Sequence, residues 1–300
     1  MKDMQKIEAK GLKIAVLILL FMGTLGVVVS QMANSGAILI DGIFSLISAF
    51  TTLIAIKVSS LLTKENEKYP FGYSGYEPLY VLLRSFLLII TVLMALLDAV
   101  SKIIIYFTTG NIPVVNAKVF MIYVIFIAIM YVVLNMHYGK YCKLTDDKSE
   151  LLLAEKFNAK ANSMIMVGVG GSFVFIGLLK FTPLKFLVPI SDSIIVFIIA
   201  TMVMIDTIKL FIKTISVLGG AGTTVEENDE LLNSIKRKFL NEIDIKNLRV
   251  QKKGKTAFVV VDIDIKDEKI EKDRINKISN IIKDSVKEKY ELNHTFINVA

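Results

Sequence analysis

Long apolar stretches alternate with short polar connections along the first 218 residues of the chain. Each stretch has the roughly 20 residues that an α-helix needs to cross a hydrocarbon core about 30 Å thick. Proline and glycine residues fall between the stretches, as they do in loops. The stretches run approximately over residues 14–31, 36–61, 79–106, 114–136, 159–179 and 187–210. This pattern predicts an α-helical membrane domain with six transmembrane helices.

The pattern changes near Gly219, beyond which charged residues of both signs are dense. Two segments there have apolar residues at helical spacing, and three shorter segments read as strands. Their order is helix 226–241, strand 248–251, strand 257–265, helix 270–290 and strand 295–299. In the second strand, alternation places Val259, Val261 and Ile263 on one face. We therefore expect two domains, residues 1–218 in the membrane and residues 219–300 as a soluble αββαβ domain.

Composition supports a membrane protein and excludes several other classes. Hydrophobic residues make up 54% of the chain, too many for an ordinary soluble or a disordered protein. The single cysteine, Cys142, excludes an internal disulfide and a cysteine-rich zinc module. Two isolated histidines, His137 and His294, are too few for a histidine-rich metal site, and we expect both to be structural. No Ser-His-Asp set or H-E-x-x-H motif is present, so we expect neither enzyme activity nor a cofactor.

The net charge of +7 belongs mainly to the apolar part, which has 19 basic and 13 acidic residues before Gly219. The remaining segment has 16 basic and 15 acidic residues, and this balance does not favour a nucleic-acid partner. Lysines gather in the N-terminal arm and in the second and fourth connections. Because short cytoplasmic loops are enriched in Lys and Arg, we expect a multi-pass plasma-membrane protein with both termini in the cytoplasm.

Four acidic residues lie within or at the ends of the apolar stretches, where an ionised side chain is costly. Three of them have a local explanation. Asp98 precedes Lys102 by one helical turn, and Asp206 precedes Lys209 by three residues, so each can form an ion pair. Asp192 lies at the start of a helix, where a carboxylate caps free amide groups.

The fourth acid, Asp41, lies inside an apolar stretch with no basic residue within two turns along the sequence. Ser45 follows one turn later on the same face, and Asn158 and Asn162 repeat this spacing on the fifth stretch. Two helices that each present such an oxygen pair could enclose a small cation, or Asp41 could carry a proton. The alternative is a buried protonated carboxyl, with asparagines that only join helices.

The segment Tyr69-Pro-Phe-Gly-Tyr73, with Glu77 after it, resembles the HPFGH or YPFGY…E segment of the cation diffusion facilitator family. The run Ser35–Asp41 resembles the second span of that family, and the resemblance covers nearly the whole chain. It implies a proton-coupled exporter of divalent metal cations with six spans and cytoplasmic termini. It also implies a cytoplasmic ferredoxin-like domain that forms a homodimer, and a metal site built by the second and fifth spans.

Carried over by position, the metal ligands that the resemblance implies are Asp41, Ser45, Asn158 and Asn162. A typical zinc exporter of the family has two aspartates on the second span, and a histidine and an aspartate on the fifth. Only one of those three carboxylates is present here, and no imidazole. Zinc favours thiolate and imidazole ligands, so an oxygen-rich site suits manganese or ferrous iron better than zinc.

Three functions stay open on this basis. The first is proton-coupled efflux of a divalent metal cation across the lipid bilayer. The second is a degenerate family member that no longer transports and acts as a dimeric membrane scaffold or regulator, because three of the four usual ligands are replaced. The third is transport of a different small cation or solute on the same fold.

Overall fold

The computed structural model describes residues 2–33, 36–62, 64, 66–110, 117–179, 190–239, 244–264, 272–290 and 292–299. The chain divides into two compact units. The first comprises residues 1–60 and 80–212, and the second comprises residues 61–79 and 213–300.

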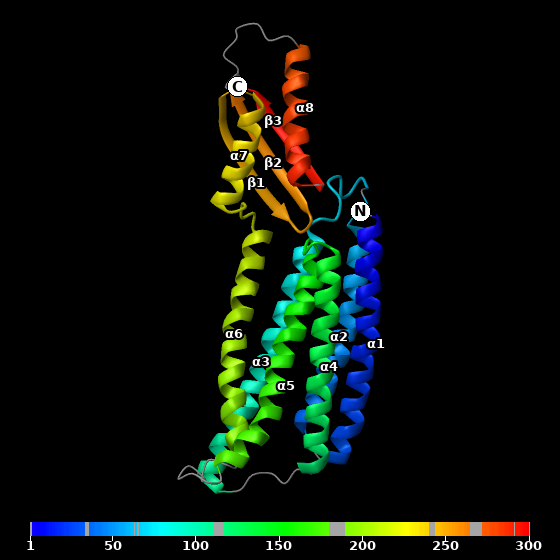
Figure 1. Cartoon of the computed structure of the whole chain (residues 1–300), viewed down its shortest axis with the longest axis vertical. Helices are drawn as coiled ribbons and strands as arrows, with labels where there is room; N and C mark the ends of the chain where they lie inside the picture. The colour runs from blue at the N-terminus through cyan, green and yellow to red at the C-terminus, as the bar shows by residue number, and fades with distance from the viewer. Residues whose placement is uncertain are drawn as a thin grey trace. The chain divides into compact units, whose positions relative to one another are not determined.

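The first unit is a bundle of long helices that run side by side (Figure 1). Among the described residues, α1, α2, α3, α4 and α6 are each long and apolar enough to cross a membrane. This confirms a helical membrane protein, whereas a crossing by α5, the fifth of the six expected spans, stays a prediction. The helices are α1 (Lys2–Ala33), α2 (Gly36–Leu61), α3 (Tyr76–Thr109), α4 (Ala117–Leu144), α5 (Glu150–Leu179) and α6 (Ser191–Leu218).

A close crossing of α1 and α2 depends on two glycines. A Cβ atom built on Gly26 would lie 2.6 Å from the Cα atom of Gly42 and 2.7 Å from the hydroxyl of Tyr123. No side chain fits at such distances, so the glycines let the two backbones touch. The crossing fixes α2 at Gly42, next to Asp41, and brings Tyr123 of α4 to the same level.

A short connection joins α4 to α5 and sets the register of α5. The backbone amide of Leu152 donates to the hydroxyl of Ser149 at 3.2 Å, which caps the start of α5. The same hydroxyl bonds to the buried carboxylate of Glu8 on α1, which also accepts from Ser59 on α2. The starts of α1 and α5 and the end of α2 are therefore held together by one buried carboxylate.

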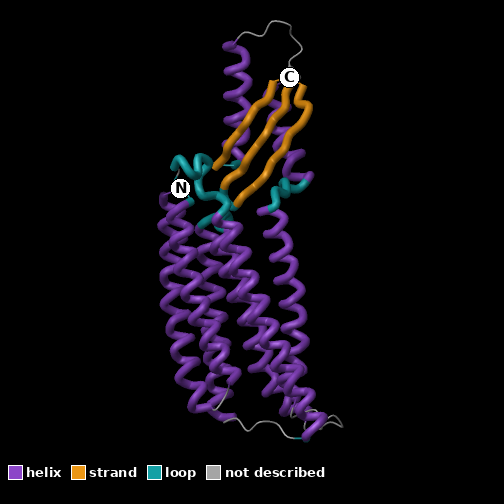
Figure 2. Tube along the Cα trace, turned by 180° about the vertical axis from the view of Figure 1, so that it is seen from behind, coloured by secondary structure: helices purple, strands orange, loops and turns teal. Residues whose placement is uncertain are grey.

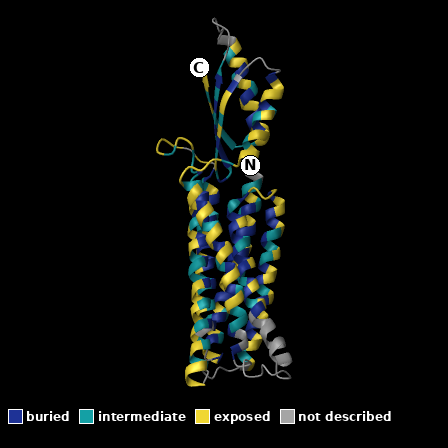
Figure 3. Cartoon of the chain, turned by 90° about the vertical axis from the view of Figure 1, so that its left-hand side faces the viewer, coloured by how far each residue is buried: buried dark blue, intermediate teal, exposed yellow. Residues whose placement is uncertain are grey.

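Apolar side chains pack α3, α5 and α6 against one another, and many other apolar side chains of these long helices are exposed. Figure 3 marks the exposed positions along the helices in yellow. An exposed apolar surface of this kind suits contact with lipid. The buried layer consists of Leu88, Val92, Ala161, Ile165, Ala200 and Val203.

The second unit contains a three-stranded sheet in the order β1-β2-β3, visible as three adjacent strands in Figure 2. Strands β1 and β2 form an antiparallel hairpin, and β3 pairs parallel to β2 after a crossover through α8. The αββαβ order of elements is as expected, and the ferredoxin-like assignment stays a prediction. The elements are α7 (Val225–Phe239), β1 (Asp244–Lys253), β2 (Thr256–Asp264), α8 (Lys272–Lys289) and β3 (Leu292–Val299).

Two strands are longer than the sequence pattern indicates. The sequence pattern indicates the first over residues 248–251, whereas β1 extends over Asp244–Lys253 with a register shift between Ile245 and Asn247. The shift interrupts the alternation of apolar and polar residues, which hides the start of the strand from pattern reading. Strand β3 likewise begins three residues before its expected start at Thr295.

The expected alternation of side chains between the two faces of β2 is confirmed. Val259, Val261 and Ile263 are buried on one face. They pack in one core with residues of α7 and α8, including Leu231 and Ile282. Both helices therefore cover the same face of the sheet.

The connection between α2 and α3 belongs to this second unit. The ring of Phe71 packs edge-on against Phe258, His294 and Phe296, with ring centroids 5.2 to 6.1 Å apart. The buried carboxylate of Glu77 accepts a hydrogen bond of 3.0 Å from the backbone amide of Lys255. The ring of His294 is thus packed between aromatic side chains, as expected of a structural histidine.

Candidate functional site

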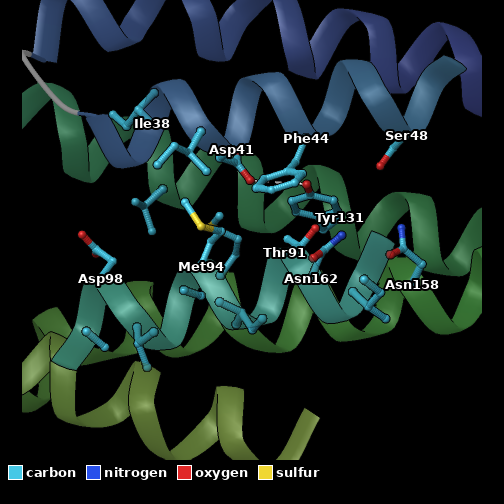
Figure 4. A pocket seen from close by; sticks show the side chains of 18 of the residues that line it. Ile38, Asp41, Phe44, Ser48, Thr91, Met94, Asp98, Tyr131, Asn158 and Asn162 are labelled. Atoms are coloured by element: carbon cyan, nitrogen blue, oxygen red, sulfur yellow. Dashed lines mark hydrogen bonds between the residues drawn. The ribbon is translucent and has the colours of Figure 1, made fainter. Parts of the chain in front are cut away.

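A cavity of about 150 Å³ lies within the helix bundle of the first unit. Three of the four expected ligands line it: Asp41 from α2, with Asn158 and Asn162 from α5. Figure 4 shows these side chains pointing into a common space. The residues found to line the cavity do not include Ser45, which is buried and whose hydroxyl lies 3.3 Å from that of Tyr131.

Two tyrosines of α4 hold the carboxylate of Asp41. The hydroxyl of Tyr123 donates to Oδ2 at 2.6 Å, and that of Tyr131 donates more weakly to Oδ1 at 3.4 Å. These bonds compensate the carboxylate for its loss of water, because hydrogen bonds to ionised groups are strong in a low-dielectric interior. A cation that binds to Asp41 must compete with them or displace them.

These tyrosines do not stand out as single positions in the sequence pattern. Tyr123, Tyr131 and Tyr138 are spaced by eight and seven residues, which places them on one face of α4. All three are buried. Hydroxyls repeated along one face of an apolar helix were the signal that could have found them.

Arg84 of α3 lines the same cavity and is almost completely buried. Its Nη1 donates to the hydroxyls of Ser48 at 3.2 Å and Thr51 at 3.1 Å, both on α2. Its Nη2 forms an ion pair with Glu155 of α5 at 2.8 Å. Arg84 is the only arginine before Gly219 in the sequence. A single arginine among apolar stretches is itself a signal of a buried charge, which a search limited to acidic residues does not find.

Glu155 is the acceptor at the centre of this buried network. Its Oε1 accepts from the hydroxyl of Tyr80, and its Oε2 accepts from Tyr138 at 3.3 Å as well as from Arg84. The side chains of Arg84 and Glu155 are only 4% and 1% exposed. A buried pair is stable only when such additional hydrogen bonds complete its coordination.

The expected local ion pairs are confirmed. Lys102 lies 2.6 Å from Asp98, and this pair also lines the cavity. Lys209 lies 3.8 Å from Asp206, and both side chains are exposed. The side chain of Asp192 falls outside the described residues, so its capping role stays a prediction.

His137 does not contribute to the cavity lining found here. Its Nε2 donates to the backbone carbonyl of Gly11 at 2.9 Å, as expected of a structural histidine. Within the parts of the chain that the structure describes, no three His, Cys, Asp or Glu side chains are grouped to hold a metal ion. Besides the ion-paired Asp98, the cavity lining offers the carboxylate of Asp41 and neutral amide and hydroxyl oxygens, which are ligand types that hard cations favour.

Comparison with known families gives one match. A family model described as the cation efflux transmembrane domain matches residues 12–218, which is more than half of the chain. The matched range contains the four expected ligands and both members of the Arg84–Glu155 pair, and it ends at the last residue of α6. The curated proteins give no match.

Proposed function

The chain belongs to the cation efflux family of metal cation transporters, and from this premise we propose that it exports a divalent cation in exchange for protons. One observation carries this proposal. The carboxylate of Asp41 is placed in an apolar helix bundle and lines a cavity together with Asn158 and Asn162. An ionisable group in such a place is expensive and is expected to serve transport.

The donor set supports a hard cation as the substrate. One carboxylate with amide and hydroxyl oxygens matches manganese, ferrous iron or magnesium, which retain water ligands and bind oxygen well. Zinc would find neither thiolate nor imidazole at Asp41, Asn158 or Asn162. We therefore propose manganese or ferrous iron ahead of zinc.

The exchange of a cation for a proton follows from the single negative charge of Asp41. The carboxylate can hold either a cation or a proton, because one negative charge does not offset both. Binding of a cation releases the proton, and release of the cation on the other side allows a proton to return. The hydroxyls of Tyr123 and Tyr131 hold the carboxylate in position between these events.

The remaining parts of the proposal concern location and assembly. We place the protein in the plasma membrane with both termini in the cytoplasm, on the distribution of lysines. The αββαβ unit is the element that we assign to homodimer formation, by analogy with the family.

A transport assay tests the proposal. Proteoliposomes with a pH-sensitive dye inside receive manganese, ferrous iron, magnesium, cobalt or zinc outside. We expect manganese or iron to move protons, and Asp41→Asn to abolish the signal. Asp206→Asn is the matched control, because its carboxylate is exposed and paired locally with Lys209. Proton movement with zinc alone would contradict the substrate assignment.

The second candidate is a non-transporting dimeric scaffold or regulator. It is favoured by the engagement of both oxygens of Asp41 with tyrosine hydroxyls, which satisfies the carboxylate without a cation. In the same assay, this candidate predicts no proton movement with any metal, although the protein forms a dimer in the bilayer.

A further inference from the structure

We infer that Arg84 and Glu155 form a pair that sets the charge of the cavity and thereby its affinity for cations. This inference rests on the transport function proposed above. Arg84 opposes cation binding at Asp41, and Glu155 limits that opposition by neutralising Arg84. The pair is then an electrostatic control on the site and not only a link between helices.

The first support is the position of Arg84. Its side chain lines the cavity that also holds Asp41, Asn158 and Asn162. A cation that enters this cavity is therefore exposed to the guanidinium charge, with little water to screen it. In a transporter of cations, a buried positive charge at this place requires a reason.

The second support is the set of hydrogen bonds that fixes the position of the Arg84 guanidinium group. Nη1 is bonded to Ser48 and Thr51 on α2, and Nη2 to Glu155 on α5. The buried Nε atom of Arg84 has no hydrogen-bond partner among the described residues. The charge is thus fixed at the cavity wall by neighbours on two helices.

The third support is the balance of charges around the cavity. Asp98 and Lys102 form an ion pair and cancel each other. Arg84 and Glu155 do the same, which leaves the single negative charge of Asp41 for a cation. Removing Arg84 makes the surroundings more negative, and removing the charge of Glu155 makes them more positive.

This arrangement predicts effects of opposite sign, which a purely structural pair does not. If the pair only joined α3 to α5, loss of either partner would destabilise the protein and weaken binding alike. If the pair sets the charge, Arg84→Gln strengthens cation binding and Glu155→Gln weakens it. The double variant restores neutrality and returns the affinity toward that of the wild type.

Manganese binding to the purified full-length protein in detergent, measured by calorimetry at about pH 8, provides the test. We expect Kd to fall at least about threefold in Arg84→Gln and to rise at least about threefold in Glu155→Gln, since unit charges at cavity distances act strongly in a low-dielectric interior. The double variant should lie near the wild type. Arg84→Lys keeps the charge and should also bind like the wild type.

Shifts of the same sign in both single variants, or unchanged Kd values with lowered melting temperatures, would overturn the inference. If Arg84→Gln does not fold, Glu155→Gln must still bind at least about threefold more weakly than the double variant. Equal affinities of those two would overturn the inference as well. If the wild type neither binds manganese nor moves protons, the proposed function itself fails. If the wild type transports normally and the Kd values of the variants are unchanged, only the role of the pair is wrong.

Discussion

The carboxylate of Asp41 accepts two hydrogen bonds of unequal strength. The bond from Tyr123 is short at 2.6 Å, whereas that from Tyr131 is long at 3.4 Å. Hydrogen bonds weaken steeply beyond the normal range, so Tyr123 contributes most of the compensation for burial. The carboxylate can turn away from Tyr131 toward the cavity at little cost while it stays bonded to Tyr123.

Tyr123→Phe should therefore destabilise the folded protein by about 1–3 kcal/mol, the usual cost of removing a hydrogen bond to a buried charged group. Thermal melting of the purified protein measures this. The control is Tyr141→Phe on the same helix, because the described part of the chain shows no hydrogen bond to the hydroxyl of Tyr141. Equal melting temperatures for the two variants would contradict the dominant role of Tyr123.

At this scale, the sequence revealed the groups that stand out alone and missed those that depend on distant partners. Asp41 and the two asparagines were visible because their polarity breaks an apolar pattern, and the cavity includes all three. The partner of Arg84 is 71 residues away on another helix. Pairing over that distance is decided by how α3 and α5 pack, which local spacing does not encode.

At the scale of the elements, the contact between α1 and α2 controls the geometry around Asp41. Gly26 faces both the backbone of Gly42 and the hydroxyl of Tyr123. Backbone atoms cannot move aside as a flexible side chain can. The packing of two helices and the orientation of the site therefore depend on the same two glycines.

Gly26→Ala should destabilise the protein by about 1–3 kcal/mol, the typical cost of overpacking, and should reduce transport by displacing Tyr123. The control is Gly139→Ala on α4, where the added methyl group would meet only Lys156 Cε at 3.9 Å. Alanine at position 139 should leave stability unchanged or slightly raised because of its higher helix propensity. Melting curves and the proteoliposome assay compare the two, and equal behaviour would contradict the close-crossing argument.

The elements themselves were largely predictable. Hydrophobic periodicity located the long helices and the αββαβ order, since burial in lipid or against a sheet imposes a pattern on the sequence. Strand lengths were less predictable, because the shift between Ile245 and Asn247 interrupts alternation. The attachment of the α2–α3 connection to the sheet was not expected at all, since it joins segments about 180 residues apart.

At the scale of the whole molecule, the connection between α2 and α3 belongs to the same compact unit as the sheet, far from it in the sequence. Phe71 of this connection packs on β2 and β3, and Glu77 in the first turn of α3 accepts a hydrogen bond from Lys255 in the β1–β2 hairpin. The segment that resembles the family motif is thus part of the second unit. Aromatic contacts of this kind contribute about 0.5–1.5 kcal/mol per ring pair beyond area burial.

Phe71→Ala should release this connection from the sheet. We expect trypsin to cleave after Lys64 or Lys68 at least about threefold faster, because loss of these ring contacts lowers the free energy of local opening by about 1 kcal/mol or more. Val225→Ala in the same unit is the control, since that side chain is largely exposed. Unchanged cleavage in the Phe71 variant would show that the aromatic contacts do not hold the connection.

We propose that the carboxylate of Asp41 binds the transported cation inside the bundle. A structure determined with manganese, using its anomalous scattering, tests this most directly. We predict one peak in the cavity at about 2.0–2.6 Å from an oxygen of Asp41, the range for hard cations bound by carboxylates, and no peak in Asp41→Asn. A manganese ion bound elsewhere, with Asp41 still held by both tyrosines, would contradict the account.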